Sequence, residues 1–145
     1  MKIRPIVQFK SNEEFQEIAK YLQHILFLDD WFVRYELSDT PIKIDDSDAM
    51  GTCSYDYSNR EAVIRVQNCE NDKSNILVTR NTALLDLIHE ILHLKEEYIS
   101  LSDSFPHIKD GESDSDKIHK HMQLEQMAKT LFMSLTGVDK SFFEK

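Results

Sequence analysis

The sequence predicts a single α+β domain built from three helices and a small three-stranded sheet. Apolar residues recur at helical spacing in three stretches, near the beginning, the middle and the end of the chain. Between the first two stretches, shorter segments alternate apolar and polar residues, as half-buried strands do. With 145 residues, no internal repeats and no linker-like segment, the chain is expected to fold as one domain over residues 1–145.

The first helix is predicted to begin after Ser11, which stands three residues before Glu14 as in a capping box. Its helical spacing continues to about Leu28. Two aspartates then break the pattern, and alternation over residues 31–37 predicts the first strand. The polar segment 38–48 that follows is predicted to be a loop.

Two further strands are predicted over residues 51–57 and 61–67. Ser58 and Asn59 between them are typical of a tight hairpin turn, since asparagine tolerates a positive φ. With a two-residue turn, the pairing would place five residues on one face of the hairpin: Cys53, Tyr55, Ala62, Ile64 and Val66.

Two long helices are predicted in the second half of the chain. The first of them runs from a cap at Asn81 to about Tyr98. The last helix runs from about Ser113 to Leu135, and Gly137 just after it is a natural helix stop.

The helix that follows Asn81 contains the pattern His-Glu-x-x-His at residues 89–93. Four residues of helix turn the chain a little over one revolution, so His89 and His93 project from the same face. Two imidazoles placed in this way can share one zinc ion, and Glu90 beside them could take a proton from a metal-bound water. The alternative is a helix with two half-exposed histidines and a surface glutamate. A stripe of apolar residues favours burial of this helix: Leu84, Ile88, Ile91 and Leu92.

A catalytic zinc site needs a third protein ligand, which must come from another segment. Glu97 lies about 12 Å along the helix from His89, too far for both to reach one ion. On the last helix, Glu125 falls within the apolar arc, where an ionised carboxylate is costly unless a cation neutralises it. The alternative for Glu125 is a boundary residue that reaches water. His121 lies one turn earlier on the same face, as a substitute ligand or a residue that lines the cleft.

Composition excludes several classes of partner. The formal net charge is −9, from 17 basic and 26 acidic residues, and no basic patch offsets it, which argues against nucleic-acid binding. No apolar run approaches the roughly 18 residues that cross a bilayer. The N-terminus lacks the features of a signal peptide, so a cytoplasmic location without membrane attachment is expected. Cys53 and Cys69 are not spaced as zinc ligands and are predicted to be free thiols that pack as small apolar residues.

Two stretches carry a resemblance to known proteins: Leu87-Ile-His-Glu-Ile-Leu-His-Leu94, and the helix from Glu125-Gln-Met-Ala128 to Leu131-Phe-Met-Ser-Leu135. They resemble the minigluzincins, the smallest gluzincin metallopeptidases, and the catalytic region of the ImmA/IrrE family. The predicted order of helix, short sheet, motif helix and glutamate-bearing helix is similar to the plan of these proteins.

The resemblance implies a zincin-like fold and zinc-dependent hydrolysis of peptide bonds. His89, His93 and Glu125 would hold the zinc ion, and Glu90 would act as general base toward a zinc-bound water. The chain departs from the pattern at Lys129, where thermolysin-like members have an aspartate that orients a histidine. An orienting group would therefore have to come from elsewhere in the chain.

The family plan also implies that the strand at residues 62–66 is an edge onto which an extended peptide or protein substrate adds. The tail 141–145, with its two phenylalanines, is a candidate cover for the cleft. The competing hypothesis is a catalytically silent, zincin-like binding or regulatory protein, for example of a phage or another mobile element. A purely structural zinc site is the weaker alternative, because such a site needs no general base.

Overall fold

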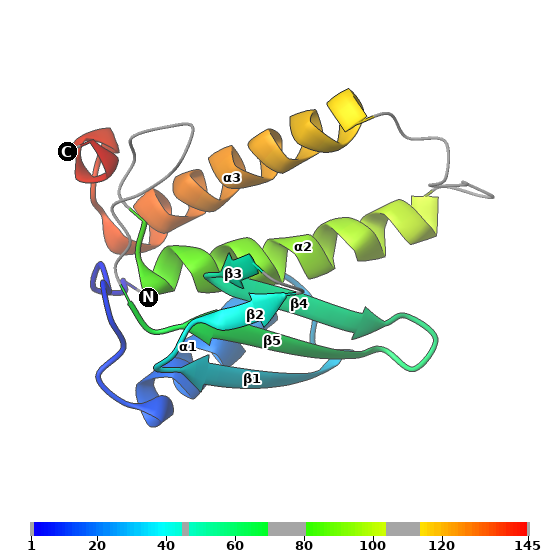
Figure 1. Ribbon diagram of the computed structural model, residues 1–145, viewed down its shortest axis with the longest axis horizontal. Helices are drawn as coiled ribbons and strands as arrows, with labels where there is room; N and C mark the ends of the chain where they lie inside the picture. The colour runs from blue at the N-terminus through cyan, green and yellow to red at the C-terminus, as the bar shows by residue number, and fades with distance from the viewer. Residues whose placement is uncertain (1, 45–46, 70–80, 104–113, 145) are drawn as a thin grey trace.

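The structure, a computed structural model, describes residues 2–44, 47–69, 81–103 and 114–144 (Figure 1). This part of the chain is α+β, as predicted, with three α-helices, a three-stranded sheet and a two-stranded hairpin. None of the helices in it has the length and apolarity that crossing a membrane would require. The elements in chain order are α1 (Asn12–Ile25), β1 (Phe32–Ser38), β2 (Ile42–Ile44), β3 (Ser47–Ala49), β4 (Gly51–Asp56), β5 (Glu61–Gln67), α2 (Ala83–Asp103), α3 (Asp114–Thr136) and the 3-10 helix η2 (Lys140–Phe143).

β5 is the central strand of the three-stranded sheet, whose order is β1-β5-β4. β1 runs parallel to β5, and β4 runs antiparallel to it. The expectation that residues 62–66 form a substrate-binding edge is therefore wrong, because β5 is paired on both sides. β4 is an edge strand of this sheet instead, and it also packs against α2.

The predicted register of the β4–β5 hairpin is confirmed, since Tyr55 lies opposite Ala62 and Cys53 opposite Ile64. The turn itself differs from the prediction: the residue with positive φ is Arg60, at 52°, and not an asparagine. The Asp56 carboxylate supports the turn by accepting hydrogen bonds from the backbone N–H of Ser58 and from Nδ2 of Asn59. Local side-chain bonding of this kind stabilises a turn without glycine.

The short hairpin β2–β3 lies in the segment that was predicted to be a loop. Each of its strands has three residues, too few for an alternating pattern to be recognised. Ile42 is nevertheless buried, which anchors β2 to the rest of the domain.

Helix α1 begins as predicted, with the hydroxyl of Ser11 accepting a hydrogen bond from the N–H of Glu14 at 3.1 Å. The Glu14 carboxylate in turn accepts from the backbone N–H of Lys10. The helix ends at Ile25, three residues earlier than predicted, because Phe27 adopts a left-handed conformation with φ of 58°. Apolar spacing continued past this break, so the sequence pattern alone did not reveal it.

Helix α2 begins after Thr82, not at a cap formed by Asn81, because the Thr82 hydroxyl accepts from the N–H of Leu85 at 3.2 Å. The helix extends to Asp103, five residues beyond the predicted end. Helix α3 agrees with its prediction and ends just before Gly137, whose φ of 81° suits glycine at a helix stop.

Helix α2 lies between the sheet and α3, and its apolar residues form the centre of the core (Figure 1). Nearly every apolar position in its first half is buried: Ala83, Leu84, Leu85, Leu87, Ile88, Ile91, Leu92 and Leu94. The sheet contributes Tyr35 and Ile64, and α1 contributes Phe15. A polar side chain of α2 that points toward α3 or β4 therefore lies next to buried apolar residues.

The tail packs against α3, since the rings of Phe142 and Phe143 lie 5.2 and 5.3 Å from the ring of Phe132. Phe132 is seven residues beyond Glu125, about 10 Å along the helix. The expectation that the tail covers the predicted cleft is therefore wrong for its described residues.

Replacement of Phe132 by alanine should destabilise the protein by about 3–5 kcal/mol, because a fully buried ring with two aromatic neighbours is lost. Urea unfolding followed by circular dichroism measures this change. Met127→Ala, at a position that is 56% exposed on the same helix, is the control and should change stability by less than about 0.5 kcal/mol. Equal losses for the two variants would contradict the packing described.

Candidate metal centre

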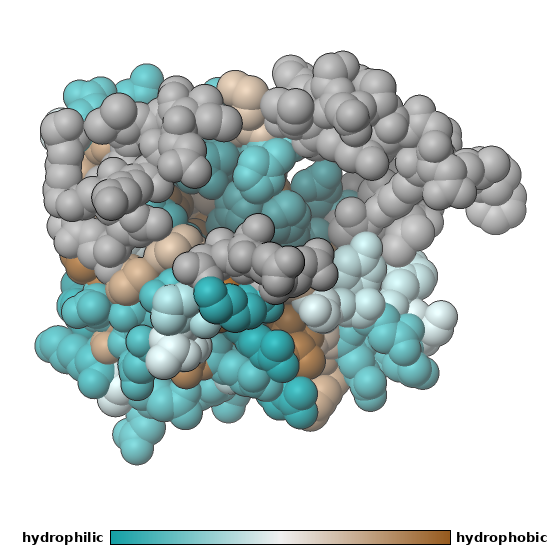
Figure 2. All heavy atoms as spheres, viewed as in Figure 1, coloured by the Kyte–Doolittle hydropathy of each residue, from teal (hydrophilic) through white to brown (hydrophobic). Residues whose placement is uncertain are grey.

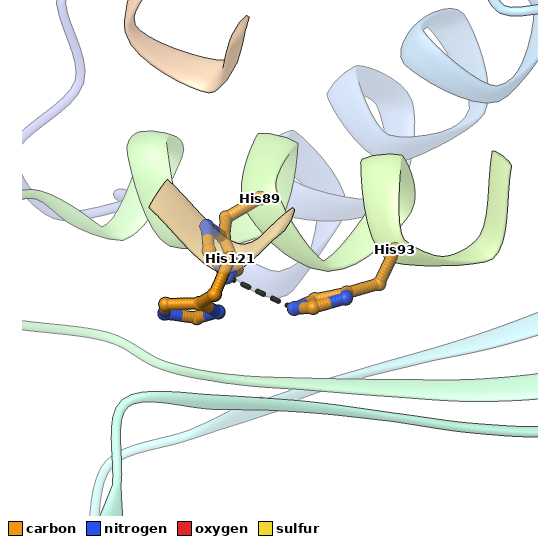
Figure 3. Close-up of side chains that lie close together, drawn as sticks. All are labelled: His89, His93 and His121. Carbon is orange, nitrogen blue, oxygen red and sulfur yellow. Dashed lines mark hydrogen bonds between the residues drawn. The ribbon is translucent and has the colours of Figure 1, made fainter. Parts of the chain in front are cut away.

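His89 and His93 project side by side from one face of α2, as their spacing predicts (Figure 3). Their Nε2 atoms lie 3.0 Å apart, and their ring centroids are 4.7 Å apart. This is the separation expected of two donor atoms that bind the same ion, each about 2.0–2.1 Å from it. In the structure these two nitrogens share a hydrogen bond, and both lie close enough to bind one ion.

His121, from the beginning of α3, completes a group of three imidazoles (Figure 3). Its ring centroid lies 5.1 Å from that of His89 and 5.9 Å from that of His93. One donor atom from each of the three rings lies within 4.8 Å of the others, so the three histidines are close enough to bind one metal ion. The sequence had indicated His121 as a substitute ligand or a residue that lines the cleft.

Glu125, the predicted third ligand, lies one helical turn after His121 and contacts the other edge of the His89 ring. Its Oε2 atom is 2.9 Å from Nδ1 of His89. This Nδ1 is buried, and the Glu125 carboxylate is its partner, forming an ion pair when the imidazole is protonated. Lys129, at the position that departs from the family pattern, lies over the ring of Phe143 with its Nζ 5.7 Å from the centroid.

Glu90 points into the space between α2 and β4 and is only 8% exposed. Its closest neighbour on β4 is Gly51, where an added Cβ would lie 2.9 Å from Cγ and 3.0 Å from Oε2 of the glutamate. Contacts under 3.0 Å are not tolerated, so the absence of a side chain at Gly51 makes room for the carboxylate. Burial raises the pKa of Glu90 to about 7, with His89 lowering it and Glu125 raising it to smaller extents.

Asp86 is a buried carboxylate that the sequence analysis did not single out. It lies three residues before His89 on α2, is 7% exposed, and accepts a hydrogen bond from Nδ2 of Asn81 at 2.7 Å. Burial raises its pKa to about 7, although the bond from Asn81 acts in the opposite direction. The signal that could have revealed it was the spacing, because a residue three positions before a histidine shares its helix face.

Two of the histidines are held in the neutral form that binds metals. Burial, with smaller contributions from the neighbouring His89 and His121, lowers the pKa of His93 to about 4. Burial also lowers the pKa of His121. For His89, burial acts in the same direction but is outweighed by the carboxylates of Glu125, Glu90 and Asp86 together, so its pKa is raised. Neutral imidazoles offer a lone pair to a cation.

A cleft of about 700 Å³ opens over these side chains, and Figure 2 shows a hollow lined largely by hydrophilic residues on this face of the molecule. β4 forms one wall with residues 51–55, and β2 contributes Ile42 and Lys43. The helical wall consists of the six polar side chains described above: Asp86, His89, Glu90, His93, His121 and Glu125.

Both cysteines are free, as predicted. Cys53 is half-buried, packs against the core and also lines the cleft. Burial raises the pKa of its thiol to about 12, and the Glu90 carboxylate adds to the effect. Cys53 is therefore held as a thiol and not as a nucleophilic thiolate.

Comparisons of the chain with protein-family models, with curated proteins and with solved structures find no match.

The residues present suit a bound cation. The alternative of half-exposed histidines and a surface glutamate is wrong, because the side chain of His89 is 12% exposed and Glu90 is 8% exposed. Three carboxylates and three imidazoles line the cleft together. A divalent cation among them would offset the cost of desolvating these carboxylates.

The raised pKa values predict how pH affects the stability of the metal-free protein. Asp86 and Glu90 keep their protons to a higher pH in the folded protein than in the unfolded chain, because burial disfavours their ionised forms. Their contribution to stability is therefore fully present below pH 4 and lost as the pH rises through about 7. Zinc should raise the melting temperature, and more at about pH 8 than at about pH 6, since it binds the ionised site.

Thermal unfolding with a chelator or with equimolar zinc measures this effect at the two pH values. His93→Ala is the control and should show a much smaller rise on zinc addition. Identical melting temperatures with and without zinc at both pH values would contradict metal binding at this site.

Proposed function

We propose that this protein is a zinc-dependent metallopeptidase that hydrolyses peptide bonds. The observation that carries the proposal is the juxtaposition of a buried carboxylate, Glu90, with three converging imidazoles in a cleft bordered by an edge strand. A purely structural metal site would have no use for an unpaired general base beside the ligands. Such a site is also normally closed by four protein ligands, whereas a catalytic site has an open position.

Zinc is the metal that best suits the donors. Imidazole nitrogen with nearby carboxylate oxygen is a common ligand set for zinc in hydrolases. When bound, zinc supplies Lewis-acid chemistry: it lowers the pKa of water toward neutrality and polarises a carbonyl group. His89 and His93 on α2 are proposed ligands, and the third comes from α3, where Glu125 and His121 both face the site.

Glu90 is the proposed general base. It would take a proton from the attacking water and return it to the amine that leaves when the peptide bond breaks. Its pKa of about 7 suits a group that must both accept and donate a proton near neutral pH. Gly51 holds open the space in which the carboxylate lies, so both the strand and the helix set the position of the base.

The wall formed by β4 suits an extended peptide. The N–H of Gln67 donates to the carbonyl of Met50 at 2.8 Å, so this pair is hydrogen-bonded across the hairpin. In an antiparallel ladder the hydrogen-bonded pairs alternate, which turns the backbone groups of Gly51, Cys53 and Tyr55 away from β5. These groups border the cleft, where a substrate could add as a further strand. The proposed substrate is thus a peptide or an unfolded protein segment.

Substitution of Glu90 by glutamine should lower peptide cleavage by about 100- to 10,000-fold while one equivalent of zinc stays bound. The amide keeps the shape of the side chain but cannot accept the proton. Cleavage of denatured casein by the zinc-loaded protein and metal analysis provide the two measurements. If the wild-type and Glu90→Gln proteins bind zinc equally and neither cleaves, the competing hypothesis of a silent binding or regulatory protein replaces this one.

Substitution of Gly51 by alanine should lower turnover by about 100-fold, because the new Cβ displaces the Glu90 carboxylate from its position. Stability should change little, because the cost of displacing the buried carboxylate offsets the advantage of alanine over glycine within a strand. The turnover number, zinc content and melting temperature are the quantities to measure.

The matched control is the double variant Gly51→Ala/Glu90→Gln. It should be no slower than Glu90→Gln alone, because the displaced group is already inactive. Additive losses in the double variant would show that Gly51 acts on something other than Glu90.

A further inference from the structure

The two nitrogens of the His89 ring have different partners. Nε2 faces Nε2 of His93 at 3.0 Å, whereas Nδ1 lies 2.9 Å from Oε2 of Glu125. The two nitrogens lie on different edges of an imidazole and their lone pairs diverge. A cation shared by the Nε2 atoms of His89 and His93 is therefore bound at one edge of the ring, while Glu125 occupies the other.

We infer that His121 is the third metal ligand and that Glu125 is a positioning residue, which acts through Nδ1 of His89. This inference deepens the proposed function by assigning the two side chains of α3 that face the site. It differs from the resemblance, which implies that Glu125 binds the zinc ion directly.

The direction of α3 separates the two roles. Helix α3 runs antiparallel to α2 (Figure 1), so the turn from His121 to Glu125 leads away from His93. Within the described residues, the donor atoms that all lie within 4.8 Å of one another belong to His89, His93 and His121. Glu125 is not part of this group, although it contacts one of its members.

A carboxylate at Nδ1 has a definite effect on the histidine. It favours the tautomer that carries its hydrogen on Nδ1, which leaves the lone pair of Nε2 free for the metal. It also resists rotation of the ring and makes Nε2 a stronger donor. Because Nδ1 of His89 is buried, the ring has little access to water that could substitute for the carboxylate.

The contact between Glu125 and His89 also explains how the chain can have Lys129 where the family pattern has an orienting aspartate. The family pattern places the orienting carboxylate four residues after the ligand glutamate, and this chain has a lysine there. The Lys129 side chain lies over Phe143 and is directed toward the tail. Glu125 supplies the orienting carboxylate from one turn earlier, and His121, a further turn earlier, supplies the ligand.

The test is metal affinity, measured on the purified full chain by competition with a chromophoric chelator, first with zinc and then with cobalt. Glu125→Ala should weaken zinc binding by about 10- to 100-fold, the range for a group that orients a metal-bound histidine, and should keep one bound ion. Glu125→Gln should recover most of this loss, because its amide oxygen can still accept from Nδ1–H of His89. His121→Ala should weaken binding beyond that range and change the visible spectrum of the cobalt form.

Gln126→Ala, at an exposed position on the same helix, is the control and should bind as the wild type does. His121 is itself exposed and Glu125→Gln preserves shape, so both variants should fold, which circular dichroism verifies. The inference is overturned if Glu125→Gln loses the metal while His121→Ala retains it, or if the wild-type chain binds no metal. If the ligand pattern is as expected but no peptide is cleaved, the inference stands and the proposed peptidase activity does not.

Discussion

The candidate site depends on the burial of the polar face of helix α2. Helix α2 is packed on its apolar sides against the sheet, α1 and α3, and this packing brings Asp86, His89, Glu90 and His93 to the margin of the core. Their intervals of three and four residues place them along one line of the helix. Burial raises the pKa of Asp86 and Glu90 to about 7 and lowers that of His93 to about 4, so these three side chains resist charge unless a cation is shared.

Helix α3 and strand β4 both contribute residues that contact this polar face of α2. Helix α3 brings His121 and Glu125 to different sides of the two α2 histidines, and an ion pair holds Glu125 to one of them. On the opposite wall, β4 has glycine at the one point where a side chain would collide with Glu90. Within the described residues the same strand lies at the edge of its sheet, so one short element both makes room for the proposed base and borders the cleft.

Several features of the fold were predictable because they depend on neighbouring residues. The cap at Ser11, the helix stop at Gly137 and the register of the β4–β5 hairpin each arise within a few residues of sequence. Features of the sheet that involve distant segments were missed or wrong. The parallel pairing of β1 with β5 could not be read from the strands themselves, and it makes β5 central and β4 the edge.

The sequence by itself determined that His89, Glu90 and His93 lie together on a helix, because the geometry of a helix depends only on spacing along the chain. It also indicated a long last helix on which His121 and Glu125 share a face. Only the tertiary structure decided which edge of the His89 ring each of them meets, how deeply Glu90 and Asp86 are buried, and which strand borders them. These outcomes depend on how separate segments pack in space, which a periodic pattern of apolar residues does not specify.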